Sequence, residues 1–252
     1  MKYILILLFV SGFLPVEAQH TELDCRFYNL YIKGDMETWE FVVDSLYGQH
    51  LSLAHDYTLL LAEYGLIGYK LSQSERRDAG KLTERFEEHL QKRMKREPES
   101  ADLQALNSAL LGFKIGVKPW LAPFVNSDQN EAIANALEWR TNEAMPLVES
   151  ANSLYFRPSF VGGDRDKALA VYEQAFAILK KEKVCNWVYL NIGSWLGQVY
   201  TKFEQPQKAK QIYLELLEDA PDFKYVKDEL LPQLESGKFI DITDKLEKEY
   251  KQ

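Results

Sequence analysis

Segment 145–221 contains two helical hairpins in which residues of the same size recur at the same spacing. Ala168 and Ala209 are 41 residues apart, and Tyr172 and Tyr213 are separated by the same distance. A fixed distance between equivalent small and aromatic residues indicates a structural repeat. The chain is therefore expected to place these residues equivalently in two stacked helix pairs.

The second hairpin shows why these residue types are needed. Gly197 and Ala209 fall where its two helices are expected to cross, and only small side chains let helix backbones approach closely. Tyr200 and Tyr213, one from each helix, would fill the space beside that crossing. Pro221 cannot continue a helix and ends the hairpin. A larger side chain at Gly197 is therefore expected to push the helices apart.

This pattern resembles the tetratricopeptide repeat (TPR), a helix–turn–helix unit. The second hairpin carries it at Leu196, Gly197, Tyr200, Ala209, Tyr213 and Pro221. The first hairpin repeats part of it at Ala151, Leu154, Ala168, Tyr172 and Ala175. The turn of the first hairpin, with Gly162-Gly163-Asp164 after Pro158, is similar to that of exported bacterial TPR proteins. The resemblance implies stacked hairpins and a role in binding.

Helical spacing of apolar residues also occurs outside the two hairpins. It predicts helices over 36–49, 52–70, 74–97, 100–116, 127–139, 222–236 and 244–250, with a turn at 119–123. Segment 20–35 is ambiguous, but Gly34 and Asp35 end its pattern and suit the cap of the next helix. No stretch shows sustained strand alternation. We expect an all-α fold of about ten helices, stacked as antiparallel pairs in a TPR-like solenoid.

Segment 1–18 has the features of a signal peptide. Lys2 precedes an apolar run of about a dozen residues, which is too short to span a bilayer, and Ala18 precedes the expected cleavage site. Residues 19–252 would then form a single TPR-like helical domain. The sequence predicts a periplasmic or secreted protein, peripheral to the envelope at most, with no transmembrane helix in the mature chain.

The charge balance limits the classes of partner. The chain has 30 basic and 38 acidic side chains, a net charge of −8. Proteins that bind nucleic acids or anionic membranes are usually basic. We therefore expect no nucleic-acid partner.

The two cysteines, Cys25 and Cys185, leave two possibilities open. In an oxidising compartment they could form one disulfide that closes a loop of about 160 residues. They could equally be two buried or reduced thiols, because two cysteines alone are weak evidence of a bond.

No motif predicts catalysis, a cofactor or a metal site. Gly162 and Gly163 lack the Lys-Ser/Thr pair of a phosphate loop, so we interpret them as a turn with Asp164 as the following N-cap. The polar run 126–130 lacks the glycine and glutamate that a calcium loop requires. The four histidines are expected on the surface: His20, His50, His55 and His89.

The first helices of stacked TPR hairpins line a concave face that holds ligands in that family. By register this partner-binding groove would be lined by Met145, Glu149, Asn152, Tyr155, Asn191, Trp195 and Gln198. Asn152 matches an asparagine of the TPR clamps that hold peptide carboxylates, but Val148 replaces the clamp lysine. A C-terminal carboxylate is therefore not the expected ligand. The alternative is that N-terminal helices cover these residues.

The sequence favours a non-catalytic periplasmic binding or scaffold protein that engages a protein or peptide. The alternative is a small-ligand-binding helical protein, accessory to a transport system. A third hypothesis is an unrecognised hydrolase. An open groove rimmed by polar residues would favour the first, and an enclosed aromatic cavity the second. Titratable groups converging in a pocket would favour the third.

Overall fold

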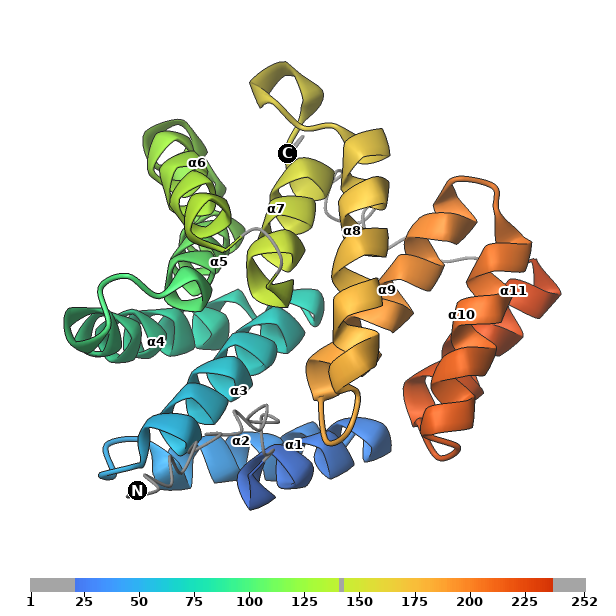
Figure 1. Ribbon diagram of the computed structural model, residues 1–252, viewed down its shortest axis with the longest axis horizontal. Coiled ribbons are helices and arrows are strands. Elements are labelled where there is room, and N and C mark those ends of the chain that lie inside the picture. The colour runs from blue at the N-terminus through green and yellow to red at the C-terminus, as the bar shows by residue number, and fades with distance from the viewer. Residues whose placement is uncertain (1–20, 141–142, 238–252) are drawn as a thin grey trace, which may run out of the picture.

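The computed structural model describes residues 21–140 and 143–237, and these residues are helical with no strand (Figure 1). The helices are α1 (Glu22–Lys33), α2 (Met36–Leu46), α3 (Leu53–Ser72), α4 (Arg76–Arg96), α5 (Ala101–Val117), α6 (Ala122–Trp139), α7 (Ala144–Phe156), α8 (Arg165–Leu179), α9 (Trp187–Lys202), α10 (Pro206–Asp219) and α11 (Leu231–Ser236). Short 3₁₀ turns lie at Pro119–Leu121, Ser159–Val161 and Lys180–Glu182, and a π-helical segment, Tyr225–Leu230, runs into α11. The all-α prediction is confirmed. The expected signal peptide and the helix at 244–250 lie outside the described residues.

Side-chain caps set several helix starts. Ser52, Ser100 and Asp35 accept hydrogen bonds from backbone N–H groups in the first turns of α3, α5 and α2. The ambiguous segment 20–35 is helical as α1, because Thr21 and Asp24 form a capping box at its start. Gly34 ends α1 in the left-handed conformation, as its sequence position predicts.

The predicted start of the helix at Ser127 is wrong. The 3₁₀ turn at Pro119–Leu121 leads directly into α6, which begins at Ala122. Pro123 is compatible with this earlier start, because the first turn of a helix makes no use of its N–H groups. The polar residues after Asn126 therefore lie inside the helix.

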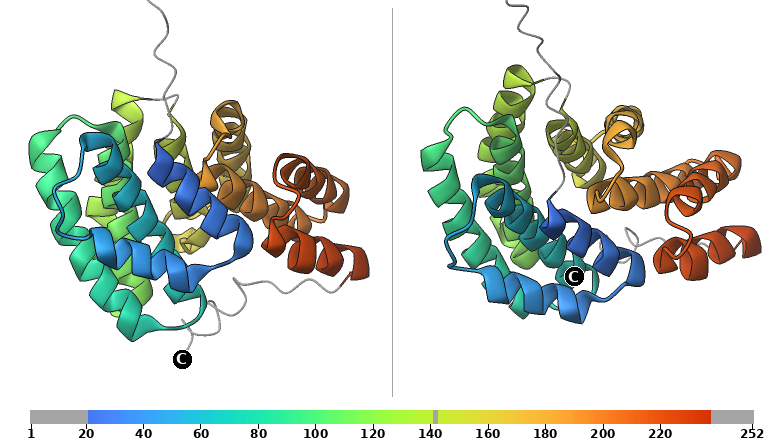
Figure 2. Two further views of the ribbon diagram at one scale, coloured as in Figure 1. Left: turned by 90° about the horizontal axis from the view of Figure 1, so that it is seen from below. Right: turned by 60° about the horizontal axis from the view of Figure 1, so that its bottom comes forward.

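Consecutive helices pack against each other from α2 to α10, and the array then closes on itself. Figure 2 shows α1 between the N-terminal helices and the C-terminal hairpins, and α1 contacts both α3 and α9. Trp187, at the start of α9, packs edge-on against Trp39 with ring centroids 5.2 Å apart. A Cβ atom at Gly65 of α3 would lie 2.7 Å from the Trp187 ring. Gly65 is therefore a point of close approach between α3 and α9, whereas a Cβ atom at Gly68 would have no neighbour within 4 Å.

The crossing of α9 and α10 has the predicted residues. A Cβ atom added at Gly197 would lie 2.2 Å from the Tyr213 ring, which is itself buried. Ala209 is also fully buried. The Tyr213 ring therefore occupies the space that a side chain at position 197 would need.

Cys25 and Cys185 form a disulfide, which resolves the choice that the sequence left open. Their Cα atoms are 4.4 Å apart, and 160 residues separate them in the chain. Cys25 lies on α1 and Cys185 lies just before α9. The bond thus fastens α1 to the start of α9, where the Trp187 ring also packs against Tyr31 of α1.

We expect Gly197→Leu to lower the free energy of unfolding by about 1–3 kcal/mol or more, because the new side chain overlaps Tyr213. Thermal melts monitored by circular dichroism measure the effect. Gly68→Leu is the matched control, since its position in α3 is open. Equal melting temperatures for Gly197→Leu and the parent would contradict the crossing.

We expect replacement of both cysteines by serine to cost about 2–5 kcal/mol, because the bond restricts the unfolded chain over a long loop. Urea unfolding of the oxidised parent and the variant measures this. The parent treated with a reductant should unfold at the same urea concentration as the variant. A parent insensitive to the reductant would argue against the disulfide.

Candidate functional site

The seven residues expected to line a concave groove do not form an open face. Met145, Glu149, Tyr155 and Gln198 are buried, and Asn152, Asn191 and Trp195 are half-buried. The expectation of an open concave groove is therefore wrong for these positions. The alternative, in which N-terminal helices cover these residues, agrees with their burial.

Helix α3 covers the middle of this face. Tyr64 donates a hydrogen bond through Oη to Glu149 Oε1 at 2.8 Å. Asn152 Nδ2 donates to the same carboxyl oxygen at 2.9 Å, and Asn152 Oδ1 accepts from Tyr172 Oη of α8 at 2.7 Å. These four side chains, of which Glu149 and Tyr172 are buried and Tyr64 and Asn152 half-buried, form a polar cluster that joins α3, α7 and α8.

Helix α1 covers the other end of this face. Asn191 Nδ2 donates to Tyr31 Oη at 2.9 Å. Trp195 stacks on Phe156 with ring centroids 5.3 Å apart and meets Tyr155 edge-on. Gln198 donates to the backbone carbonyl of Ser194, one turn earlier. The side chains that sequence register assigned to a ligand thus contact the protein itself.

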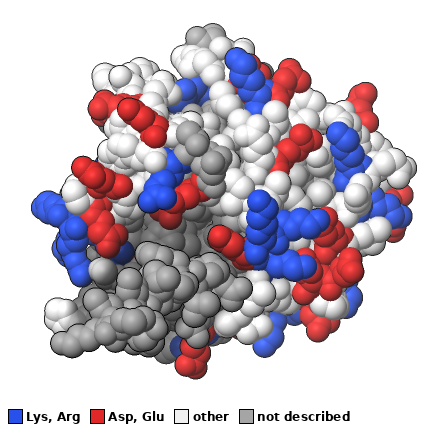
Figure 3. Space-filling view, viewed as in Figure 1, with Lys and Arg blue, Asp and Glu red and all other residues white. Residues whose placement is uncertain are grey.

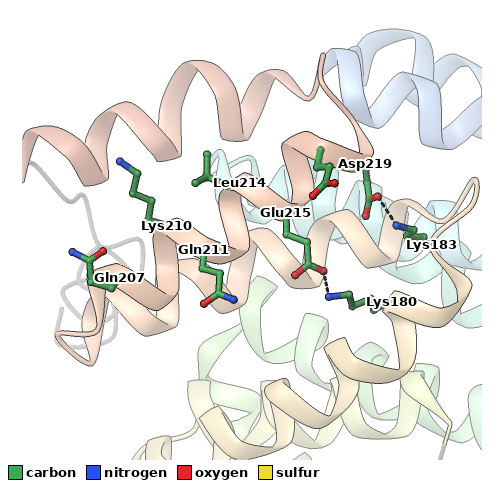
Figure 4. A pocket seen from close by; sticks show the side chains of 9 residues that line it. Lys180, Lys183, Gln207, Lys210, Gln211, Leu214, Glu215 and Asp219 are labelled. Atoms are coloured by element: carbon green, nitrogen blue, oxygen red, sulfur yellow. Dashed lines mark hydrogen bonds and ion pairs between the residues drawn. The ribbon is translucent and has the colours of Figure 1, made fainter.

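An open concavity among the described residues lies on α10 instead. Its volume is about 590 Å³, and Figure 4 shows the lining side chains along the outer face of α10 and at the turn after α8. The lining residues are Lys180, Lys183, Gln207, Lys210, Gln211, Leu214, Glu215, Glu218 and Asp219. We call this the α10 groove. It was missed because its residues are ordinary exposed helix residues in the sequence.

Ion pairs organise the α10 groove. Lys180 Nζ lies 2.6 Å from Glu215 Oε1, and Lys183 pairs with Asp219. Asp219 also accepts a hydrogen bond from Tyr189 Oη at 2.8 Å. Burial would raise the pKa of Asp219, but its bonds to Lys183 and Tyr189 outweigh this and lower it. The Asp219 carboxylate is therefore held in its ionised form at one end of the groove, and Glu215 is paired with Lys180 beside it.

The other end of the α10 groove is less charged. Gln207 and Gln211 lie one helical turn apart and face outward (Figure 4). Leu214 follows on the same side and is 49% exposed. Two amides and one aliphatic side chain thus stand in a row beside the paired charges. This arrangement offers hydrogen bonds and one apolar contact.

The turn at Gly162-Gly163 has the structure that the sequence predicts. Gly162 has φ +97°, and a Cβ at Gly163 would lie 1.8 Å from the carbonyl oxygen of Arg157. Asp164 caps α8 by accepting from the N–H of Lys167 at 3.0 Å. A second open concavity of about 550 Å³ borders this turn, lined by Arg157, Pro158, Ser159, Gly163, Asp164, Arg165 and Asp166.

The expectation that His89 lies on the surface is wrong. Its Nδ1 lies 2.6 Å from Glu63 Oε2 and its Nε2 lies 3.1 Å from Asp56 Oδ1, in the contact between α3 and α4. Arg93 completes the cluster with Asp56, and Arg85 lies beside Glu63. Glu63 is only 1% exposed, so its charge requires these partners. Of the other histidines, His50 is exposed, His55 is half-buried and His20 lies outside the described residues.

The geometry of His89 indicates the imidazolium form, because both ring nitrogens face carboxylate oxygens and both must donate. Burial lowers the pKa of His89, but the hydrogen bonds and charges of Glu63 and Asp56 outweigh it, so the pKa is raised overall. The stabilisation of the fold by the His89 charge is therefore fully present below the ordinary pKa of histidine. It is lost as pH rises through the raised pKa that His89 has in the folded protein.

We expect His89→Gln to cost about 1–3 kcal/mol of stability near pH 6, because it leaves two carboxylates without their shared cation. The cost should shrink at alkaline pH, where the parent also loses the charge. Urea unfolding across this pH range measures both. His50→Gln, at an exposed site, is the control. A cost that does not change with pH would contradict the imidazolium assignment.

Charged and aromatic side chains lie elsewhere on the described surface. Positive and negative side chains are interspersed over the face in Figure 3. Trp120 and Phe124, in the segment that starts α6, are 66% and 72% exposed.

Within the described residues, no group of three or more potential ligands is placed to hold a metal ion. None of the described helices has the length and apolar character needed to cross a membrane.

Comparison with known proteins finds no matching family model, no similar curated protein and no similar solved structure.

Proposed function

We propose that this chain is an exported, non-catalytic binding or scaffold protein of TPR-like architecture, and that it engages an extended segment of a protein or peptide. The observation that carries this proposal is the α10 groove, which is open and lined almost entirely by polar side chains. This is the type of site that distinguishes a peptide-binding surface from an enclosed ligand pocket.

The lining of the α10 groove suits an extended peptide. Gln207 and Gln211 each offer a donor and an acceptor, which match the carbonyl and N–H groups of a peptide backbone. Leu214 offers an apolar contact beside them. The pairs Lys180–Glu215 and Lys183–Asp219 offer both signs of charge to a partner's side chains. The repeat register put the binding face on the first helices, whereas this proposal puts it on a second helix.

Export is supported by the disulfide. Disulfides persist in oxidising compartments and are rare in the cytosol. The signal-peptide features of segment 1–18 point the same way. We therefore place the protein in the periplasm or outside the cell.

The alternative is a small-ligand-binding protein, and it has less support. Such a protein encloses its ligand in a mostly apolar cavity. The aromatic side chains on the covered face of α7 and α9 pack against one another and against Tyr31 and Tyr64. The hydrolase hypothesis is also weaker, because Glu63, His89 and Arg93 form an internal ionic cluster and do not line either open concavity.

We expect the double variant Gln211→Ala, Leu214→Asp to lose partner capture while keeping its melting temperature, because both side chains lie on the surface of α10. A photo-crosslinking residue at position 207, expressed in the native host, measures capture. Position 138 on α6 is the control site.

Specific adducts should form from position 207 and disappear in the double variant. Excess unlabelled parent protein should compete with them. Adducts of the same size from position 138, or undiminished adducts in the double variant, would contradict the proposal.

A further inference from the structure

Glu149 is a carboxyl group buried where the N-terminal helices meet the hairpins. It is 4% exposed. Its Oε1 accepts hydrogen bonds from Tyr64 of α3 and Asn152 of α7, and Asn152 in turn accepts from Tyr172 of α8. Every member of this cluster other than Glu149 is uncharged in its ordinary state. The contact between α3 and α7 therefore includes an ionisable group that has only neutral partners.

The groups that face Glu149 from the neighbouring helices do not compensate its charge. They are Tyr64 of α3 and Tyr172 of α8, and burial raises the pKa of both phenols well above the ordinary value. Within the described residues, no lysine, arginine or histidine forms an ion pair with Glu149 or lowers its pKa. Helices α5 and α6 also pack against α7, and Trp195 of α9 contacts Tyr155, but none of these helices contributes a charge to Glu149.

Glu63 is a second buried carboxyl group in the same fold, and it has cationic side chains beside it. It lies on α3, one residue before Tyr64, and is 1% exposed. Arg85 and His89 both face it. Glu149 has no equivalent cation, so removing its proton places an unpaired charge in the interior. Burial of Glu63 is therefore compatible with the charged form, whereas burial of Glu149 favours the neutral form.

We propose that Glu149 makes the closure of α3 over the hairpin face depend on pH: the neutral carboxyl holds α3 against α7, and ionisation loosens this contact. The open state would expose Asn152 and its neighbours, the residues that repeat register assigns to the concave face. This inference does not rest on the α10 groove, which lies on a different surface.

The direction of the effect follows from the cost of burying the charge. Burial raises the pKa of Glu149 from 4.5 to about 7, although the bonds from Tyr64 and Asn152 lower it. Closure is therefore favoured fully below pH 4.5 and loses that advantage as pH rises towards about 7. The difference between these two pKa values corresponds to a roughly 300-fold change in the opening equilibrium.

Native-state hydrogen exchange tests the inference. Exchange in peptides from α3, α7 and α10 is measured at about pH 5 and about pH 8 and corrected for the intrinsic chemical rate. In the parent, protection of α3 and α7 should fall by up to roughly 70-fold between pH 5 and pH 8, because the open state is already partly ionised at pH 5, while α10 changes little. Glu149→Gln keeps the acceptor for Tyr64 and Asn152 but cannot ionise, so its α7 peptides should lose no protection, and its α3 peptides should lose only the part that comes from the titration of His89.

Glu138→Gln, at an exposed position on α6, is the matched control and should behave as the parent does. Equal protection of the parent at both pH values would overturn the inference, as would the same loss in Glu149→Gln. Should Glu149→Gln fail to fold, ¹³C NMR titration of the glutamate carboxyls in the parent decides the matter. A midpoint near pH 7 for one buried carboxyl supports the inference, and ordinary midpoints for all of them overturn it.

Discussion

The insertion of Trp187 against Gly65 holds the two ends of the helical array together. A stack of helix pairs would otherwise contact only its sequence neighbours and leave a concave face open to solvent. Here the indole of Trp187 occupies the space that a Cβ at Gly65 would fill, with Trp39, Tyr31 and Tyr64 around it. The Cys25–Cys185 bond fastens the same junction covalently. Closure converts the expected binding face into core.

Within the described residues, the closed array buries two glutamate carboxyl groups at two different contacts of α3, and their partners differ. Glu63 lies with Arg85 and His89, so its charge is compensated where α3 meets α4. Glu149 has only hydroxyl and amide partners where α3 meets the hairpins. Removing a charge from water is costly unless a partner and hydrogen bonds replace the solvent. The contact of α3 with α4 is therefore held by ion pairs. The contact of α3 with the hairpins packs best when the Glu149 carboxyl is neutral.

Closure also determines which surface is left for a partner. The side chains of α7 and α9 that face inward are used to pack α1 and α3. Within residues 21–140 and 143–237, no helix covers the outer face of α10 in this way, and its amides and ion pairs form an open groove. Lys180 and Lys183 are already paired with Glu215 and Asp219, so a charged segment that binds there must compete with these ion pairs or add to them. Mixed polarity of this kind fits selective binding of an extended chain better than enclosure of a small apolar molecule.

The amino-acid sequence by itself determined the helices and their local contacts. Caps such as Ser52, Ser100 and Asp164 act within one helical turn, so they can be read from neighbouring residues. Gly197 and Tyr213 are also close in the chain, and the repeat spacing predicted their crossing. The signals that fix these features are short-range and do not depend on the rest of the fold.

Only the tertiary structure decided what the inner face does. Tyr64 and Glu149 are 85 residues apart, and Tyr31 and Asn191 are 160 apart, so no local pattern reports that these pairs meet. The same holds for the disulfide and for His89, whose charged neighbours in sequence suggest an exposed helix face. Whether a helix face is surface or core depends on what packs on it. In this protein that is set by Trp187 closing the array.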